Sequence, residues 1–226
     1  MDPTAFQAEL VHVAHRIGWG VLVSCAMALA AWKVRSLTLG GAAVSAVMGA
    51  AIFSLGGFEA WLMYLAAATV ALTSWRVGQK RRGPASPKHG VGTAIASCAI
   101  AVIGSVLMAA IDDNRLGVVI LTSALAAWAS DAMAAEFGKG YGKVAGAIAG
   151  VMTAVILAGL FALAFEPLRL VAPFIGLGAV AGLLAARALS RKDGGNSLLN
   201  EDVVLFLNTL VAAAVAAGTM LLATAS

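Results

Sequence analysis

Two carboxylates interrupt one of the most apolar stretches of this chain. Asp131 follows the segment ALAAWAS at 124–130, and Glu136 comes five residues later. An ionisable side chain inside hydrocarbon is costly unless it faces a charged partner or a water-filled cavity, so we take Asp131 as the leading functional candidate. Five helical steps rotate about 140°, so the two carboxylates are expected to share one face only if the helix is distorted between them.

Basic residues gather around this pair. Lys139 and Lys143 follow it directly, and Lys80 and Arg81 are expected on the same side of the membrane. Acids and cations at one depth are the composition of a site that handles magnesium and phosphate, because Mg²⁺ takes one or two protein carboxylates plus phosphate oxygens. A buried ion pair between Asp131 and a neighbouring Lys or Arg explains the same residues. The residues alone leave both interpretations open.

A second polar group opens the last apolar run. Asn200, Glu201 and Asp202 come first, and Asn208 lies one to two turns further along. Asn200 or Asp202 can cap a helix, and acids there suit the positive end of the helix dipole. Capping does not explain Asn208, which we expect to find a hydrogen-bonding partner inside the membrane.

The elements that carry these residues are long apolar runs, in a chain of 226 residues that is 61% hydrophobic. About 20 apolar residues are needed to span a bilayer. The sequence therefore predicts an all-α, polytopic membrane bundle of about eight helices, within a single domain at 1–226 because the connections are too short to build another. The predicted spans are 12–32, 37–55, 58–75, 91–110, 116–136, 143–164, 168–187 and 203–224.

Lysine and arginine are unevenly distributed over the connections between these runs. Alternate connections hold twelve of them: Lys33, Arg35, Arg76, Lys80, Arg81, Arg82, Lys88, Lys139, Lys143, Arg187, Arg191 and Lys192. The remaining connections and the N-terminus hold three: Arg16, Arg115 and Arg169. The positive-inside rule then predicts a multi-pass protein of the cell membrane with basic connections in the cytoplasm and both termini outside it. The positive charge is explained by anionic lipid, and no nucleic-acid-binding motif is present.

Two further patterns concern packing. Glycine and alanine recur along the predicted spans, for example at Gly146 and Gly150, and this is typical of helices that pack closely in lipid. Trp19, Trp32, Trp61 and Trp75 fall near predicted span ends, where indole rings favour the membrane interface. We therefore expect these tryptophans to be interfacial anchors.

Several segments occur in an order that resembles a known family. They are RSLTLGGA at 35–42, LTSW at 72–75, KR at 80–81, SDAMAAEFG at 130–138, GAVAGLL at 178–184 and LNEDVVLFLNTL at 199–210. This order is similar to that of the phytyl-phosphate-kinase-like family of membrane proteins, over about residues 35 to 215. The first segment is close to the family pattern and the Asp131 to Glu136 segment is moderately so.

The resemblance implies an enzyme that uses a nucleoside triphosphate and Mg²⁺ to phosphorylate an isoprenyl monophosphate at the cytoplasmic face. It implies that Asp131 and Glu136 are the catalytic and metal-binding residues. The substrate- or nucleotide-binding residues that it implies are Thr38, Lys80, Arg81, Lys139, Lys143, Asn200, Asp202 and Asn208. Expected partners are membrane lipids and the isoprenyl phosphate, and a protein partner or a second copy of the chain stays open.

This chain departs from the family pattern between the two carboxylates. Ala132 and Ala135 stand where relatives usually carry a threonine and a serine. A noncatalytic membrane subunit or a lipid-binding scaffold that keeps the family's fold is therefore the alternative to a kinase.

Overall fold

The computed structural model describes residues 3–82, 89–111, 114–164, 171–190 and 199–225, without the side chains of 3–13, 79, 81, 82 and 164. The basic residues Lys88, Arg169, Arg191 and Lys192 lie outside the described residues, as do the side chains of Arg81 and Arg82.

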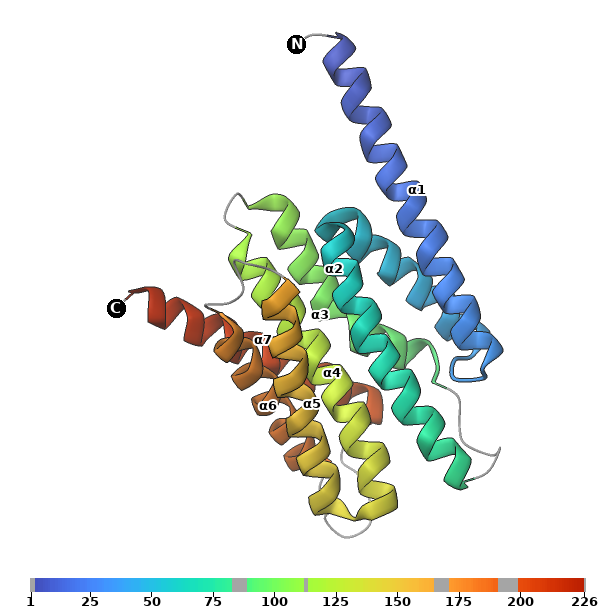
Figure 1. Cartoon of the computed structure of the whole chain (residues 1–226), viewed down its shortest axis with the longest axis vertical. Coiled ribbons are helices and arrows are strands. Elements are labelled where there is room, and N and C mark those ends of the chain that lie inside the picture. Colours follow the sequence, from blue (N-terminus) through green and yellow to red (C-terminus); the bar gives the residue numbers. More distant parts are fainter. Residues whose placement is uncertain (1–2, 83–88, 112–113, 165–170, 191–198, 226) are drawn as a thin grey trace.

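The described residues form a bundle of helices (Figure 1). The helices are α1 (Pro3–Lys33), α2 (Leu39–Arg82), α3 (Val91–Ala110), α4 (Arg115–Tyr141), α5 (Lys143–Ala164), α6 (Ala172–Leu189) and α7 (Glu201–Ala225). Each contains a stretch that is long and apolar enough to cross a membrane. The prediction of an all-α, multi-pass membrane bundle is confirmed.

One of these helices, α2, is bent back on itself. Its apolar stretch Leu39–Gly78 has 40 residues, which as a straight helix would measure about 60 Å, twice the ~30 Å of the hydrocarbon layer. Gly57 interrupts it with φ 82° and ψ −176°, a conformation almost restricted to glycine. The arms 39–56 and 58–82 correspond to the two separate spans that the sequence predicts.

The centre of the bundle is α4. This helix packs against α2, α3, α5, α6 and α7. Its middle is rich in alanine, and the hydroxyl groups of Thr122, Ser123 and Ser130 donate hydrogen bonds to backbone carbonyls of the preceding turn of α4 itself. Close packing on all sides follows, and Asp131 emerges at the end of this buried stretch.

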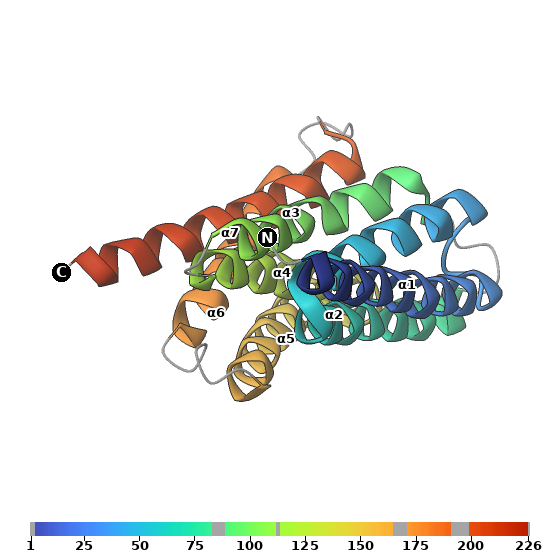
Figure 2. The same ribbon diagram turned by 90° about the horizontal axis from the view of Figure 1, so that it is seen from above.

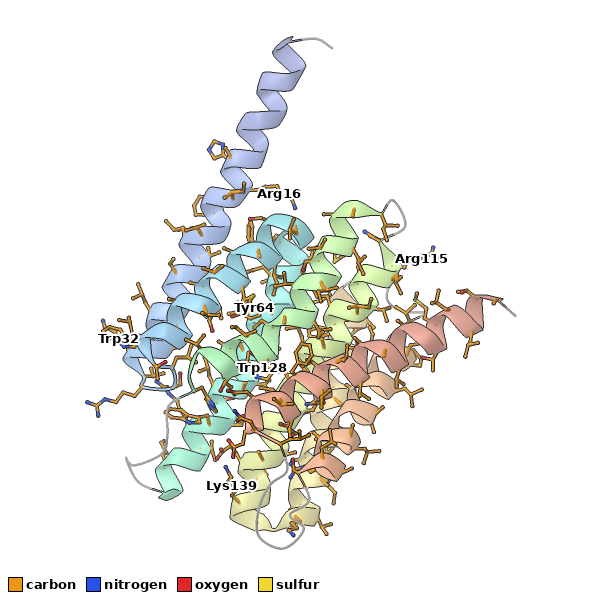
Figure 3. The ribbon with its side chains drawn as sticks, turned by 180° about the vertical axis from the view of Figure 1, so that it is seen from behind. Arg16, Trp32, Tyr64, Arg115, Trp128 and Lys139 are labelled. Atoms are coloured by element: carbon orange, nitrogen blue, oxygen red, sulfur yellow. The ribbon has the colours of Figure 1, made fainter. Side chains whose placement is uncertain are left out.

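At the edge of the bundle, α1 packs on α2, on the side away from α5 and α6, and its first turns extend beyond the other helices (Figures 1 and 2). Arg16 and Arg115 lie toward one end of the molecule, and Lys139 lies toward the other (Figure 3). The second end is the one at which the basic connections were predicted to gather.

Tight helix contacts occur where the glycine pattern predicts them. A methyl group on Gly146 would lie 2.5 Å from the carbonyl oxygen of Ala134, and one on Gly150 would lie 2.8 Å from the Ala134 side chain. The α4–α5 contact therefore depends on small residues in α5.

Candidate functional site

A pocket of about 500 Å³ lies among the helices at the basic end of the bundle. The residues around it come from α1 to α4, α6 and α7 and from the segments next to the basic connections. They are Ser24, Met27, Ala28, Ala31, Leu37, Ser45, Tyr64, Ala68, Ala71, Leu72, Trp75, His89, Thr93, Ala94, Ser97, Trp128, Asp131, Ala132, Ala135, Glu136, Lys139, Arg187, Ser190, Leu199, Glu201, Asp202, Val204 and Leu205. Described residues within or next to each of the four basic connections thus line one cavity.

Carboxylates outnumber cations in this lining. Asp131, Glu136, Glu201 and Asp202 face the pocket with Lys139 and Arg187. Because the acids are in excess, the lining by itself does not attract a phosphate group. It could hold one only together with a cation that balances the charge.

Both carboxylates of α4 reach the pocket from one continuous helix. The lining residues 128, 131, 132, 135, 136 and 139 recur at helical spacing, so they form one broad stripe. Asp131 and Glu136 lie on opposite edges of that stripe. The two carboxylates thus point in different directions, as expected of a regular helix, and both reach the pocket because it covers a wider part of the α4 surface than a single contact line would.

The carboxylate of Asp131 is not paired with another described side chain. Within the described residues it has neither a hydrogen bond nor an ion pair closer than 4.0 Å. Arg187, Lys139 and Glu201 are the charges that act on it. Of the two interpretations left open by the sequence, the geometry favours a carboxylate that faces a cavity over one sealed in an ion pair.

The N-terminus of α7 is fixed to the N-terminus of α3. Thr93 donates a hydrogen bond from Oγ1 to Oδ1 of Asp202 at 2.8 Å. Gly92 lies so close that a methyl group there would overlap the Asp202 carboxylate. Asn200 accepts a hydrogen bond at Oδ1 from the Asp202 amide at 3.3 Å, as expected of a helix cap. Asp202 therefore joins two helices as well as lining the pocket.

The segment RSLTLGGA holds His89 at the pocket. Thr38 donates its amide to the His89 carbonyl at 3.0 Å, and the His89 amide donates to the Ser36 carbonyl at 3.1 Å. Gly41 is required for this approach, because a methyl group there would lie 2.8 Å from the His89 carbonyl oxygen. Part of His89 stays exposed, yet loss of solvent lowers the pKa of its imidazole, against the opposite influence of Glu136 and Glu201.

The inner part of the pocket is apolar and aromatic. Tyr64 and Trp128 stack with ring centroids 6.3 Å apart and an interplanar angle of 22°. They lie in the middle of the bundle, further from the basic end than Lys139 (Figure 3). Trp75 also lines the cavity and is 4% exposed. The charged part of the lining, here called the mouth, thus lies at the basic end, and the remainder is mainly apolar and aromatic with the serines Ser24, Ser45 and Ser97.

The arginine of α6 completes the mouth. Arg187 lines the pocket, and its Nε and Nη2 atoms are buried with no hydrogen-bond partner among the described residues. By comparison, the Nζ atom of Lys139 lies 3.7 Å from the Oε1 atom of Glu136.

Four other predicted site residues, Thr38, Lys80, Lys143 and Asn200, lie outside the lining, and the side chain of Arg81 is outside the described residues. Thr38 caps α2 by accepting the Gly41 amide at Oγ1 over 3.1 Å. Lys80 and Lys143 are exposed near the basic end, and Asn200 is exposed at the start of α7. The structure thus brings Asp131, Glu136, Lys139 and Asp202 together in the lining. Thr38, Lys80, Lys143 and Asn200 are not part of that group.

Asn208 has the membrane-embedded partner that the sequence required. Its Nδ2 donates to the Ala127 carbonyl at 3.2 Å, and the residue is fully buried. Its Oδ1 is buried without a described partner. Asn208 belongs to the contact of α4 and α7 and does not line the pocket.

Sequence reasoning missed Arg187, His89, Thr93 and Trp128. Trp128 was detectable, because it precedes Asp131 by one helical turn. Arg187 looked like a topology signal, and nothing local places His89 or Thr93 beside α7.

The lining has donors that suit a phosphate with magnesium. Its carboxylate oxygens are the ligand type that Mg²⁺ prefers, and the unpartnered guanidinium of Arg187 is a phosphate donor. Within the described residues no group of three His, Cys, Asp or Glu side chains is placed to hold a metal. Such a site would therefore need ligand oxygens to complete the coordination.

Comparisons with known proteins are informative at the family level. The sequence profile of a family described as Integral membrane protein DUF92 matches residues 22–145, a segment that reaches from α1 into α5 and includes Asp131 and Glu136. No curated protein and no solved structure matches the chain. Since the matched segment is more than half of the chain, this protein belongs to the DUF92 family of integral membrane proteins.

Proposed function

We propose that this protein is a membrane-embedded kinase that transfers a phosphoryl group from a nucleoside triphosphate to an isoprenyl monophosphate. The observation that carries the proposal is the pocket, whose lining is charged at the basic end and mainly apolar and aromatic elsewhere. An isoprenyl phosphate has the same division into an anionic head and an apolar chain. A volume of about 500 Å³ lies within the roughly 300 to 1,000 Å³ typical of small-molecule sites.

The excess of acid in the lining fits phosphoryl transfer with a divalent cation. Bound Mg²⁺ would neutralise charge on the transferred phosphoryl group. Asp131 and Glu136 are the carboxylates proposed to hold it, since both face the pocket from the rigid central helix. The acceptor phosphate would lie between them and Arg187, and the isoprenyl chain would extend toward Tyr64 and Trp128.

The nucleotide would approach from the basic end. Lys80, Lys139 and Lys143 are exposed there, where they can attract a polyphosphate from solution. The positive-inside distribution supports a cytoplasmic location for this end, where nucleoside triphosphates are available. Labelling of single cysteines at positions 80 and 115 in intact cells checks this orientation, because only position 115 should react with an impermeant reagent.

The kinase proposal is tested by label transfer. Purified protein in nanodiscs is given labelled nucleoside triphosphate, an isoprenyl monophosphate and Mg²⁺, and the diphosphate product is measured. Asp131→Asn keeps the size of the side chain and removes its charge, so transfer should fall by about a hundredfold or more if this group holds the metal.

Glu59→Gln is the matched control, because Glu59 is an exposed acid on α2 that does not line the pocket. It should transfer phosphate like the unmodified protein. Normal transfer by the Asp131→Asn variant, in the same preparation, would end the kinase proposal.

A noncatalytic lipid-binding scaffold is the second candidate. Ala132 and Ala135 line the pocket between the two carboxylates, so this wall supplies no hydroxyl group to a reacting phosphate. The scaffold predicts a partner that copurifies in mild detergent and a cellular phenotype that is indifferent to Asp131→Asn. Recovery of the protein alone, with a phenotype destroyed by that substitution, would rule it out.

A further inference from the structure

Arg187 is the polar group of the pocket whose surroundings are least satisfied. Its Nε and Nη2 atoms are buried and have no hydrogen-bond partner among the described residues. No described carboxylate lies within 4.0 Å of its guanidinium group, although Asp131 is near enough to interact with its charge. The residue as a whole is half-buried, but buried polar atoms without a partner are rare, so these two nitrogen atoms point to a ligand.

The chemistry of the pocket limits what that ligand is. The only other Lys or Arg side chain among the described residues of the lining is Lys139, and Glu136 already lies 3.7 Å from it. Among the described residues of the lining, the Arg187 guanidinium is therefore the main charged donor available to an anion. Its planar, forked N–H groups match two oxygens of one phosphate group, which a lysine ammonium does not.

We infer that Arg187 is the phosphate-binding residue of the pocket, and that the two buried nitrogen atoms without a partner among the described residues are the donors to the phosphate. The inference rests on the proposed function only for the chemical class of the ligand, a phosphate ester, and it does not require transfer. Arg187 lies outside the segment 22–145 that matches the family profile. The family match therefore does not bear on this residue.

The inference predicts opposite effects on binding and on stability. Without ligand, burial of two guanidinium nitrogen atoms that lack a described partner is a cost, so Arg187→Gln should leave the melting temperature unchanged or raise it. With ligand, the loss of charge-assisted hydrogen bonds should weaken binding of geranylgeranyl monophosphate by roughly tenfold to a hundredfold. Binding of geranylgeraniol, which has no phosphate, should not change.

The experiment measures both quantities on the full chain in nanodiscs. Arg187→Gln and Arg187→Lys are compared with Arg76→Gln, which removes an exposed arginine near the same end of the bundle that does not line the pocket. The lysine variant keeps the charge without the fork and should bind the monophosphate with intermediate affinity. All titrations are made with Mg²⁺ present, because the acidic lining needs a cation to hold a phosphate, and separate titrations with MgATP and with inorganic phosphate identify the source of the phosphate. A loss confined to geranylgeranyl monophosphate assigns Arg187 to the acceptor, and a loss confined to MgATP assigns it to the nucleotide.

Three results would overturn the inference. One is a glutamine variant that binds every phosphate probe as tightly as Arg76→Gln does. Another is a clear fall in its melting temperature without ligand, since that is the mark of a structural arginine. The third is an unmodified protein that binds none of the probes. Binding without transfer in the unmodified protein would instead end the kinase proposal and leave the role of Arg187 intact.

Discussion

The contact between α6 and α7 gives the sharpest prediction about the fold, because it is built around a glycine with no spare room. A methyl group on Gly182 would lie 2.5 Å from the backbone oxygen of Asn208, 2.5 Å from its Oδ1 and 3.0 Å from the side chain of Ala212. The first of these atoms is backbone, so Gly182→Ala forces the two helices apart. Overpacking of this kind costs about 1 to 3 kcal/mol.

A second cost arises at Asn208. Its Nδ2 donates to the Ala127 carbonyl at 3.2 Å, and displacement of the side chain would break this buried hydrogen bond. A buried polar group left without a partner costs about 1 to 3 kcal/mol. Gly182→Ala should therefore lower the free energy of unfolding by about 2 to 6 kcal/mol in total.

The assay is equilibrium unfolding in mixed micelles with increasing SDS, followed by circular dichroism. Gly159→Ala is the control, because a methyl group there would meet nothing within 4 Å. That substitution should change the free energy by less than about 1 kcal/mol and in the stabilising direction, since alanine is the better helix former. Equal unfolding curves for Gly182→Ala and Gly159→Ala would show that α6 and α7 pack less tightly at Gly182 than the structure describes.

Two further predictions concern the hinge of α2 and the mouth of the pocket. Gly57→Ala should destabilise the protein by about 1 to 3 kcal/mol, because alanine is strained at this φ and ψ. Gly18→Ala, with nothing within 4 Å of the added methyl group, should not, and equal melting temperatures would contradict the hinge assignment. Thr93→Val removes the 2.8 Å hydrogen bond to Asp202 and should cost about 1.5 to 3 kcal/mol. Thr69→Val, which alters a hydroxyl bonded only to its own helix, should cost less than about 0.5 kcal/mol, so a similar loss in both variants would deny the α3–α7 link.

The spans could be predicted from sequence because length and hydropathy alone decide whether a segment can cross a bilayer. The division of α2 was also predicted, since two apolar runs of spanning length meet at Gly56 and Gly57. These properties are local. They need no knowledge of which helix packs against which.

The environment of single side chains was harder to predict. Trp19 and Trp32 are exposed, as expected of interfacial anchors, but Trp61 and Trp75 are 8% and 4% exposed. Trp61 donates to Ser24 of α1 at 3.2 Å, and Trp75 lines the pocket. The anchoring prediction is wrong for these two, because position along a helix fixes depth in the membrane and does not fix the face.

The candidate site was only partly predictable for the same reason. Asp131 was found because a lone charge in an apolar run is unusual in itself. Arg187 and Thr93 acquire their meaning from contacts made across the bundle, and Thr93 and Asp202 are 109 residues apart in the sequence. Polar residues near span ends are common. The sequence around Arg187 and Thr93 therefore does not distinguish them from residues that only set the orientation of the helices in the membrane.

The reversal at Gly57 has a consequence for experiments on intact cells. Counting α2 twice makes the number of crossings by the described helices even, and an even number returns a chain to the leaflet where it began. Reporter enzymes fused to the two ends should therefore be active in the same compartment. A straight α2 would have separated them, so one backbone conformation sets the sidedness of everything that follows it.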